Sequence, residues 1–202
     1  MPNLPEPYPS SRVTWVKAPS RNASTGNNPV ADLVAKILAD VKIRGDAAVR
    51  DFSAKFDTPD LPQFEVSHAE RAAAVAALDR QTRKDTEFAI ANVRRYAEAQ
   101  LATMLTLDFE ALPGVFMGHR VIPIERVGCY VPGGRFPLLS APVMTIVPAK
   151  VAGVDEVIGC LPPNAHTAMI AGWRLAGADR IFRIGGAQAI AAMALARKPC
   201  RR

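Results

Sequence analysis

Two glycine-rich turns contain the residues of this sequence best suited to binding a small anionic molecule. The first is Tyr130-Val-Pro-Gly-Gly-Arg135, and the second is Gly185-Gly-Ala-Gln188. Adjacent glycines let a backbone approach a ligand closely, and free N–H groups at the start of a helix favour phosphate. Neither turn has the GxGxxG spacing of a dinucleotide site. Nucleotide or phosphate binding and plain strand-to-helix turns therefore both remain open.

The polar side chains in these turns also allow two interpretations each. Tyr130 either stacks on or hydrogen-bonds a ligand, or it covers the edge of a sheet. Gln188 either caps its own helix or contacts a ligand. Arg135 either binds an anion or points into solvent.

The sequence offers few residues for catalysis. Its three histidines, His68, His119 and His166, are far apart and have no ligand-spaced partner. Cys129 lies in an apolar run, so we expect an inert, buried thiol. There is no HxxxH, GxSxG or P-loop pattern. We therefore expect binding residues but no catalytic residue and no metal ligand in this chain.

Alternating strands and helices position both turns. We expect three parallel strands, each followed by a helix, because short turn-rich connections separate apolar runs of strand length from runs with helical spacing. The expected strands are Val127–Val131, Glu156–Leu161 and Arg180–Ile184, and the helices are Leu139–Ala152, Ala165–Ala176 and one from Ala187. The predicted fold class is α/β, with an incomplete Rossmann-like parallel sheet whose turns lie at the carboxyl ends of the strands.

The sequence predicts helices in the part of the chain that precedes the sheet. We expect helices over Ala31–Arg44, over a segment capped by Asp46, over a segment opened by a Ser67–Glu70 capping box, and over a long segment ending near Leu105. Buried candidates on the long helix are Phe88, Val93 and Tyr96. The predicted division is a flexible arm (1–30), a helical region (31–113), an NAD-binding domain (114–196) and a basic tail (197–202).

Composition excludes several classes of protein. The net charge is +6, but four of these charges lie in the last six residues, which leaves +2 on the rest. We therefore expect no nucleic-acid binding. There is no apolar run long enough to span a membrane. Three cysteines without a CxxC motif disfavour a disulfide framework, so we expect a cytoplasmic protein.

Three ordered motifs resemble the histidinol dehydrogenase family. They are RVGCYVPGG (126–134), PAKVAGVDEVIGCLPP (148–163) and RIGGAQAIAAMA (183–194), and the likeness extends over about residues 32–194. The resemblance implies a zinc-dependent homodimer that uses NAD to oxidise an alcohol to an acid, as in the conversion of L-histidinol to L-histidine. It implies that Tyr130 and Gln188 contact NAD, with the adjacent turn glycines Gly133, Gly134, Gly185 and Gly186.

Two departures from the family pattern affect this interpretation. Arg135-Phe136 follows the first glycine turn and resembles the sulfopropanediol dehydrogenase-like branch, which oxidises other alcohols. In addition, the family's zinc ligands, its Glu-His catalytic pair and a further cofactor-contacting asparagine lie beyond the segment that matches here.

The residues after Ala194 depart from the family sequence, and one codon choice for them reads as family sequence in a shifted frame. We therefore expect a frameshifted, truncated product with an out-of-frame tail, without turnover or stoichiometric zinc on its own. The alternatives are a non-catalytic module that binds NAD or dimerises, and a misfolded product with no role.

Overall fold

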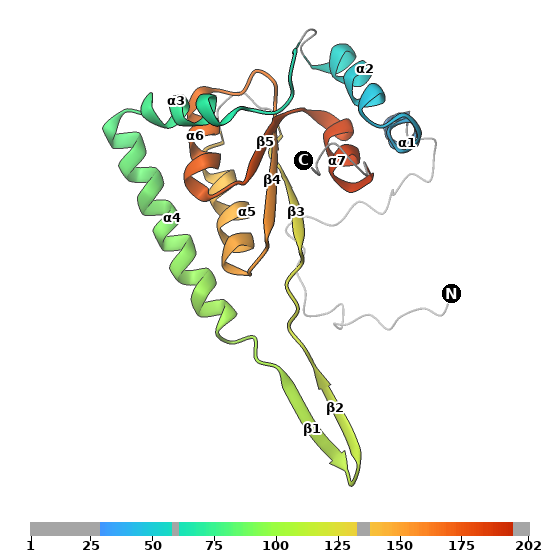
Figure 1. Ribbon diagram of the computed structural model, residues 1–202, viewed down its shortest axis with the longest axis vertical. Coiled ribbons are helices and arrows are strands. Elements are labelled where there is room, and N and C mark those ends of the chain that lie inside the picture. Colours follow the sequence, from blue (N-terminus) through green and yellow to red (C-terminus); the bar gives the residue numbers. More distant parts are fainter. Residues whose placement is uncertain (1–28, 58–60, 133–137, 196–202) are drawn as a thin grey trace, which may run out of the picture.

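The centre of the structure is a three-stranded parallel sheet (Figure 1). This computed structural model describes residues 29–57, 61–132 and 138–195. The strands are β3 (Arg126–Tyr130), β4 (Glu156–Leu161) and β5 (Arg180–Arg183), in the order β3-β4-β5. Val127 pairs with Val157, and Gly159 pairs with Ile181. The predicted α/β class with a parallel sheet is confirmed.

From Val157 to Leu161 strand β4 is apolar, because both faces of the sheet are covered. Val157 and Leu161 belong to the core on one face, whereas Ile158 and Cys160 belong to the core on the other. Gly159 leaves room for the indole of Trp173: a Cβ at this position would lie 1.9 Å from a ring carbon. The indole thus packs directly against the backbone of the central strand.

Helices cover the two faces of the sheet in separate layers (Figure 1). One layer contains α3 (His68–Ala76), α4 (Arg80–Leu101), α5 (Ser140–Val151) and α6 (Thr167–Ala176). The other contains α1 (Pro29–Arg44), α2 (Asp46–Phe56) and α7 (Gly186–Leu195). The chain changes face after β5, because α7 packs on α1, α2 and β3 rather than beside α6. The chain therefore crosses the carboxyl end of the sheet after β5, and open α/β sheets bind their ligands at this end.

Two helix starts were predicted with different success. The Ser67–Glu70 capping box is confirmed, because each residue's side chain accepts a hydrogen bond from the other's backbone N–H. The predicted cap at Asp46 is wrong. Gly45 is the N-cap of α2 and makes no side-chain cap bond, and Asp46 is the first residue of the helix.

Helix α4 packs through a different face than we expected. Thr86 and Ala97 are buried, and Ile90 and Val93 pack against the core between them. The predicted burial of Phe88 and Tyr96 is wrong, since these side chains are 68% and 71% exposed. The smaller side chains form the contact stripe, which leaves the aromatic side chains on the other side of the helix.

Residues 64–66 extend the sheet beyond β5. The N–H of Val66 donates to the carbonyl of Ile181, and the N–H of Arg183 donates to that of Phe64. Arg180 donates to both carboxylate oxygens of Glu65 at 2.9 and 2.7 Å. Paired Arg–carboxylate bonds of this kind are strong and directional, and they lower the pKa of Glu65.

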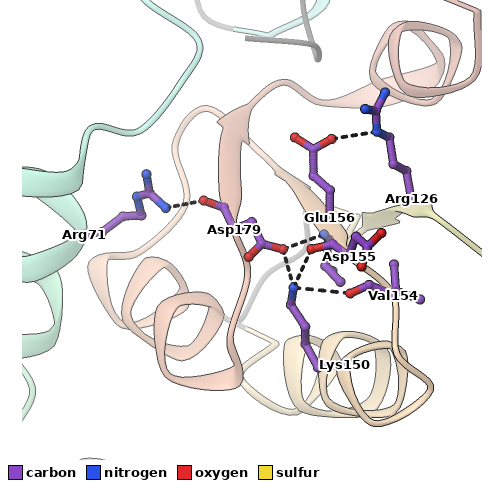
Figure 2. Close-up of polar contacts among 8 residues, drawn as sticks. Arg71, Arg126, Lys150, Val154, Asp155, Glu156 and Asp179 are labelled. Atoms are coloured by element: carbon purple, nitrogen blue, oxygen red, sulfur yellow. Dashed lines mark hydrogen bonds and ion pairs between the residues drawn. The ribbon is translucent and has the colours of Figure 1, made fainter.

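A polar network holds the amino ends of the strands (Figure 2). The Asp179 carboxylate accepts from the N–H of Val157 and from Lys150, and the Asp179 carbonyl accepts from Arg71 at 2.7 Å. Lys150 also donates to the carbonyl of Asp155 at 3.1 Å. This network joins α3, α5, β4 and β5 at the end of the sheet opposite the glycine turns, so its role is structural.

An antiparallel hairpin projects from the body (Figure 1). It consists of β1 (Leu107–Leu112) and β2 (Val115–His119). We left 107–112 in the helical region, but the alternation of apolar and acidic residues in LDFEAL suits a strand, and Gly114 has the φ of +80° that a Pro-Gly turn needs. The run Val115–Ile124 also predicts a strand from its sequence, and β2 covers the first part of it, ending at His119. Among the described residues, no helix is long and apolar enough to cross a membrane.

Candidate functional site

The carboxyl ends of β3 and β5 meet at a hydrogen bond between Tyr130 and the second glycine turn. Tyr130 is the last residue of β3 and points toward the face covered by α7. Its hydroxyl oxygen accepts from the backbone N–H of Gly186 at 2.9 Å. The two residues are 56 positions apart in the chain, so the sheet brings Tyr130 and the second glycine turn together.

Close packing of α7 against β3 makes this contact possible. A Cβ on Gly128 would lie 2.5 Å from the sulfur of Met193 in α7. The helix can therefore approach β3 closely only because residue 128 is a glycine. At the other end of the helix, Gly186 has a φ of +63°, a conformation that glycine adopts without strain.

Gln188 lies in the first turn of α7 and is buried, with 1% of its surface exposed. Its Nε2 donates to the carboxylate of Asp57 at 3.0 Å. Its Oε1 has no hydrogen-bond partner, and it lies 2.6 Å from the place where a Cβ on Gly186 would be. A buried amide oxygen without a donor is costly, so this atom needs a partner.

Asp57 also belongs to this site, although our sequence analysis did not predict it. It follows the last residue of α2, and its Oδ2 also accepts from the N–H of Gly185 at 3.2 Å. A Cβ on Gly185 would lie 2.5 Å from the Asp57 carboxylate, so a side chain at this position would displace Asp57. The two residues are 128 positions apart, and no local pattern around Asp57 indicates this contact.

The other predicted residues lie elsewhere. Gly133 and Gly134, which we predicted to bind the cofactor, and Arg135 fall outside the described residues. His166 is the N-cap of α6, where its Nδ1 accepts from the N–H of Ala168 at 3.2 Å. Burial raises the pKa of the Cys129 thiol, with a smaller opposing effect from a hydrogen bond to Thr145. A thiol with a raised pKa is a poor nucleophile.

Two cavities have linings that include neither Tyr130 nor Gln188. One, of about 360 Å³, lies between α2, residues 63–65 and α7. Two of its charged groups are engaged, since Glu65 binds Arg180 and the Arg50 guanidinium lies 4.9 Å from the centre of the Phe64 ring. The other, of about 330 Å³, is lined by His166 and Asp79, whose side chains cap α6 and α4. We favour the Tyr130–Gln188 site, where a buried polar atom lacks a partner.

Within 29–57, 61–132 and 138–195, no three His, Cys, Asp or Glu side chains are grouped so that they could hold a metal ion.

Comparison with known proteins identifies the family to which the chain belongs. The sequence model described as histidinol dehydrogenase matches residues 20–202. The chain belongs to the histidinol dehydrogenase family. Histidinol dehydrogenase homolog 1 of Mesorhizobium japonicum is 45% identical over 172 residues, which are 84% of this chain and 34% of that protein. Histidinol dehydrogenase of Methanosarcina mazei is 41% identical over 174 residues, which are 84% of this chain and 40% of that protein.

Two further relatives of this histidinol dehydrogenase-family chain extend the comparison. Sulfopropanediol 3-dehydrogenase of Ruegeria pomeroyi is 37% identical over 186 residues, covering 90% of this chain and 42% of that protein. The crystal structure of histidinol dehydrogenase from Elizabethkingia anophelis aligns with a TM-score of 0.75 at 30% identity, covering 83% of this chain and 39% of that one. The predicted resemblance is confirmed. The chain spans between about a third and two fifths of the length of these relatives.

Proposed function

We propose that this chain binds NAD where β3 and β5 end, through Tyr130 and Gln188, and forms the cofactor-binding part of an alcohol dehydrogenase. The observation that carries the proposal is the hydrogen bond between Tyr130 and Gly186, which joins the turns after two parallel strands. Family membership supports the dehydrogenase role, since the family consists of oxidoreductases.

The residues at this site fit a nucleotide cofactor. The unpartnered Gln188 Oε1 can accept a hydrogen bond from a hydroxyl or amino group of the ligand. The Tyr130 ring is half-buried, so part of it stays accessible to a ligand. NAD, when bound, supplies the hydride acceptor for oxidation of an alcohol. The residues described here orient the cofactor and exclude water, and Gly133 and Gly134 belong to the same proposal.

The residues that the structure describes do not fit the zinc ion that the family resemblance implies. The described part of the chain offers no cluster of ligands, and each of its histidines was predicted to lack a ligand-spaced partner. We therefore propose no role for the described residues in metal binding. In the proposed reaction, the described residues contribute only by binding the cofactor.

The substrate belongs to one of two classes of alcohol. Two of the relatives named above act on histidinol by name, and one acts on sulfopropanediol. We propose histidinol oxidation to the acid first, because histidinol dehydrogenase of Methanosarcina mazei is 41% identical to this chain, against 37% for sulfopropanediol 3-dehydrogenase. Oxidation of a sulfonated diol is the second candidate, which the 37% identity to sulfopropanediol 3-dehydrogenase favours.

Titration with NAD tests the proposal directly. We expect saturable binding to the 202-residue chain in calorimetry, and about tenfold weaker binding to Tyr130→Phe, because Gly186 loses the acceptor of its N–H. Tyr96→Phe is the matched control, since the Tyr96 side chain is 71% exposed on α4. NAD binding that is equal in the wild type and both variants would remove Tyr130 from the site, and no binding to the wild type would refute the proposal.

A second component of the proposal is homodimerisation through the β1–β2 hairpin. The hairpin projects from the body, and its strands chiefly contact each other (Figure 1). Large apolar side chains are exposed along both strands: Leu107, Phe109, Leu112, Val115, Phe116 and Met117. Apolar surface of this kind on a soluble body marks an interaction site. A dimerising module without turnover therefore stays as the alternative function.

A further inference from the structure

Asp57 occupies the position at the start of α7 that an anionic ligand would take. The N-terminus of a helix carries partial positive charge and attracts anions. Here the Asp57 carboxylate accepts from the N–H of Gly185 at 3.2 Å, at the residue that precedes the helix. The start of α7 thus already binds a carboxylate, that of Asp57, which directly follows α2.

The same carboxylate fixes the orientation of the Gln188 amide. A carboxylate only accepts hydrogen bonds, so it can face the Nε2 of Gln188 but not the Oε1. The Nε2 donates to Asp57 at 3.0 Å, and the Oε1 is therefore turned toward Gly186. This orientation leaves an acceptor, rather than a donor, as the amide group without a partner.

We propose that Asp57 is the positioning residue of the cofactor turn: it orients Gln188 and excludes a phosphate from the start of α7, so that the cofactor is recognised there through an uncharged hydroxyl or amino group. The inference rests on the proposed binding of NAD at Tyr130 and Gln188. Its physical basis is that a second anion beside the Asp57 carboxylate meets like-charge repulsion. The pyrophosphate of the cofactor consequently lies away from this helix end.

The tightness of the turn supports this assignment. A Cβ on Gly185 would displace the Asp57 carboxylate, and a Cβ on Gly186 would displace the Gln188 amide. The carboxylate, the amide and the two glycines therefore form one packed unit. A change at Asp57 acts on the cofactor through Gln188 and does not require Asp57 to contact the cofactor itself.

The first test measures NAD affinity in D57N. An asparagine has nearly the same shape, but its amide N–H can also face Gln188, so the Gln188 amide can turn over, direct Oε1 to residue 57 and leave the ligand without this acceptor. We expect NAD binding about tenfold weaker, with unfolding in urea unchanged within error. The matched control is D51N, on the same helix, where the side chain is 64% exposed and pairs with Arg44. Equal NAD affinity in D57N and wild type would overturn the positioning role.

The second test follows the backbone N–H resonances of Gly185 and Gly186 by ¹⁵N NMR while inorganic pyrophosphate is added. We expect no saturable shift in the wild type and a saturable shift in D57A, where the anion position is open. A saturable shift in the wild type would overturn the exclusion of phosphate, even if D57A fails to fold. If NAD leaves the wild-type resonances of Tyr130 and Gln188 unmoved, the proposed function fails, whereas the pyrophosphate arm still decides whether Asp57 occupies the helix start.

Discussion

At the scale of single residues, Gly159 determines how closely helix α6 can approach the sheet. A Cβ at residue 159 would lie 1.9 and 2.1 Å from two carbons of the Trp173 ring, whose side chain is fully buried. A buried ring of this size cannot move away without disturbing the core. We expect Gly159→Ala to destabilise the fold by about 2–3 kcal/mol, measured as a lower midpoint of unfolding in urea.

Gly172 offers a matched control for this change. It lies in α6 next to Trp173, and a Cβ there would meet only Pro142 at 3.6 Å and a backbone oxygen at 4.0 Å. These are ordinary contacts. Because alanine favours a helix over glycine, Gly172→Ala should leave stability unchanged or raise it by up to about 1 kcal/mol. A loss of stability as large as that of Gly159→Ala would show that the core resists any added methyl group, and not the Trp173 contact in particular.

At the scale of elements, Glu70 connects the start of α3 to β5. Its carboxylate accepts from Arg183 at 2.9 Å and from the N–H of Ser67 at 2.8 Å. The Arg183 hydrogen bond, followed by those to Ser67, lowers the pKa of Glu70 to about 2. In the unfolded chain a glutamate has a pKa of about 4.3. The folded state therefore gains stability from ionised Glu70 above about pH 4.3, and this gain is lost as the pH falls toward 2.

Glu70→Gln tests this pH dependence. The Glu70 side chain is 46% exposed, so solvent screens the interaction and the expected loss at pH 7 is about 1 kcal/mol. The difference between the wild type and the variant should shrink between pH 4.3 and pH 2 in urea unfolding. Glu87→Gln, which removes an exposed pair with Arg83 on α4, is the control and should cost less than about 0.5 kcal/mol. A constant difference across this pH range would contradict the role of the Glu70 charge.

The elements also show how far the sequence predicts the fold. The three parallel strands and the capping box of α3 were predictable because local patterns specify them: continuous apolar runs for β3–β5, and the spacing of Ser67 and Glu70. The pairing of residues 64–66 with β5 was not predictable, since it depends on contacts between residues about 115 positions apart. The face of α4 that is exposed was not predictable either, for a related reason. Its sequence has two apolar stripes, and only the packing against α5 and α6 selects one of them.

Some residues of the candidate site were likewise predictable from the sequence, and one was not. Tyr130 and Gln188 carry a local signal because each lies in or beside a glycine turn at the end of a strand. The sheet then brings them together through Gly186, as parallel strands with their turns at one edge must do. Asp57 has no such signal, because its role arises only when the end of α2 meets the start of α7. A carboxylate that follows a helix is ordinary in sequence and becomes informative only through its partners.

At the scale of the whole molecule, the hairpin is the part of the described chain that the body does not stabilise. A two-stranded hairpin alone is marginally stable in water, and apolar side chains on its surface need a partner. Phe109 and Phe116 are 56% and 66% exposed, one on each strand. A second copy of this chain is the proposed partner, because two such hairpins can cover each other's apolar surface.

Replacing both aromatic residues tests this assembly. We expect the wild type to sediment as a dimer in analytical ultracentrifugation, and the double variant Phe109→Ser with Phe116→Ser to shift toward the monomer by at least about tenfold in dissociation constant, because two buried aromatic anchors are removed. Ile43→Ser is the control: this side chain is 83% exposed on α1, outside the hairpin, and its loss should leave the dimer unchanged. The double variant should still bind NAD, because Tyr130 and Gln188 lie at the far end of β3 from the hairpin. A wild type that stays monomeric at high concentration would refute homodimerisation. A double variant that dimerises as well as the wild type would place the interface outside the hairpin.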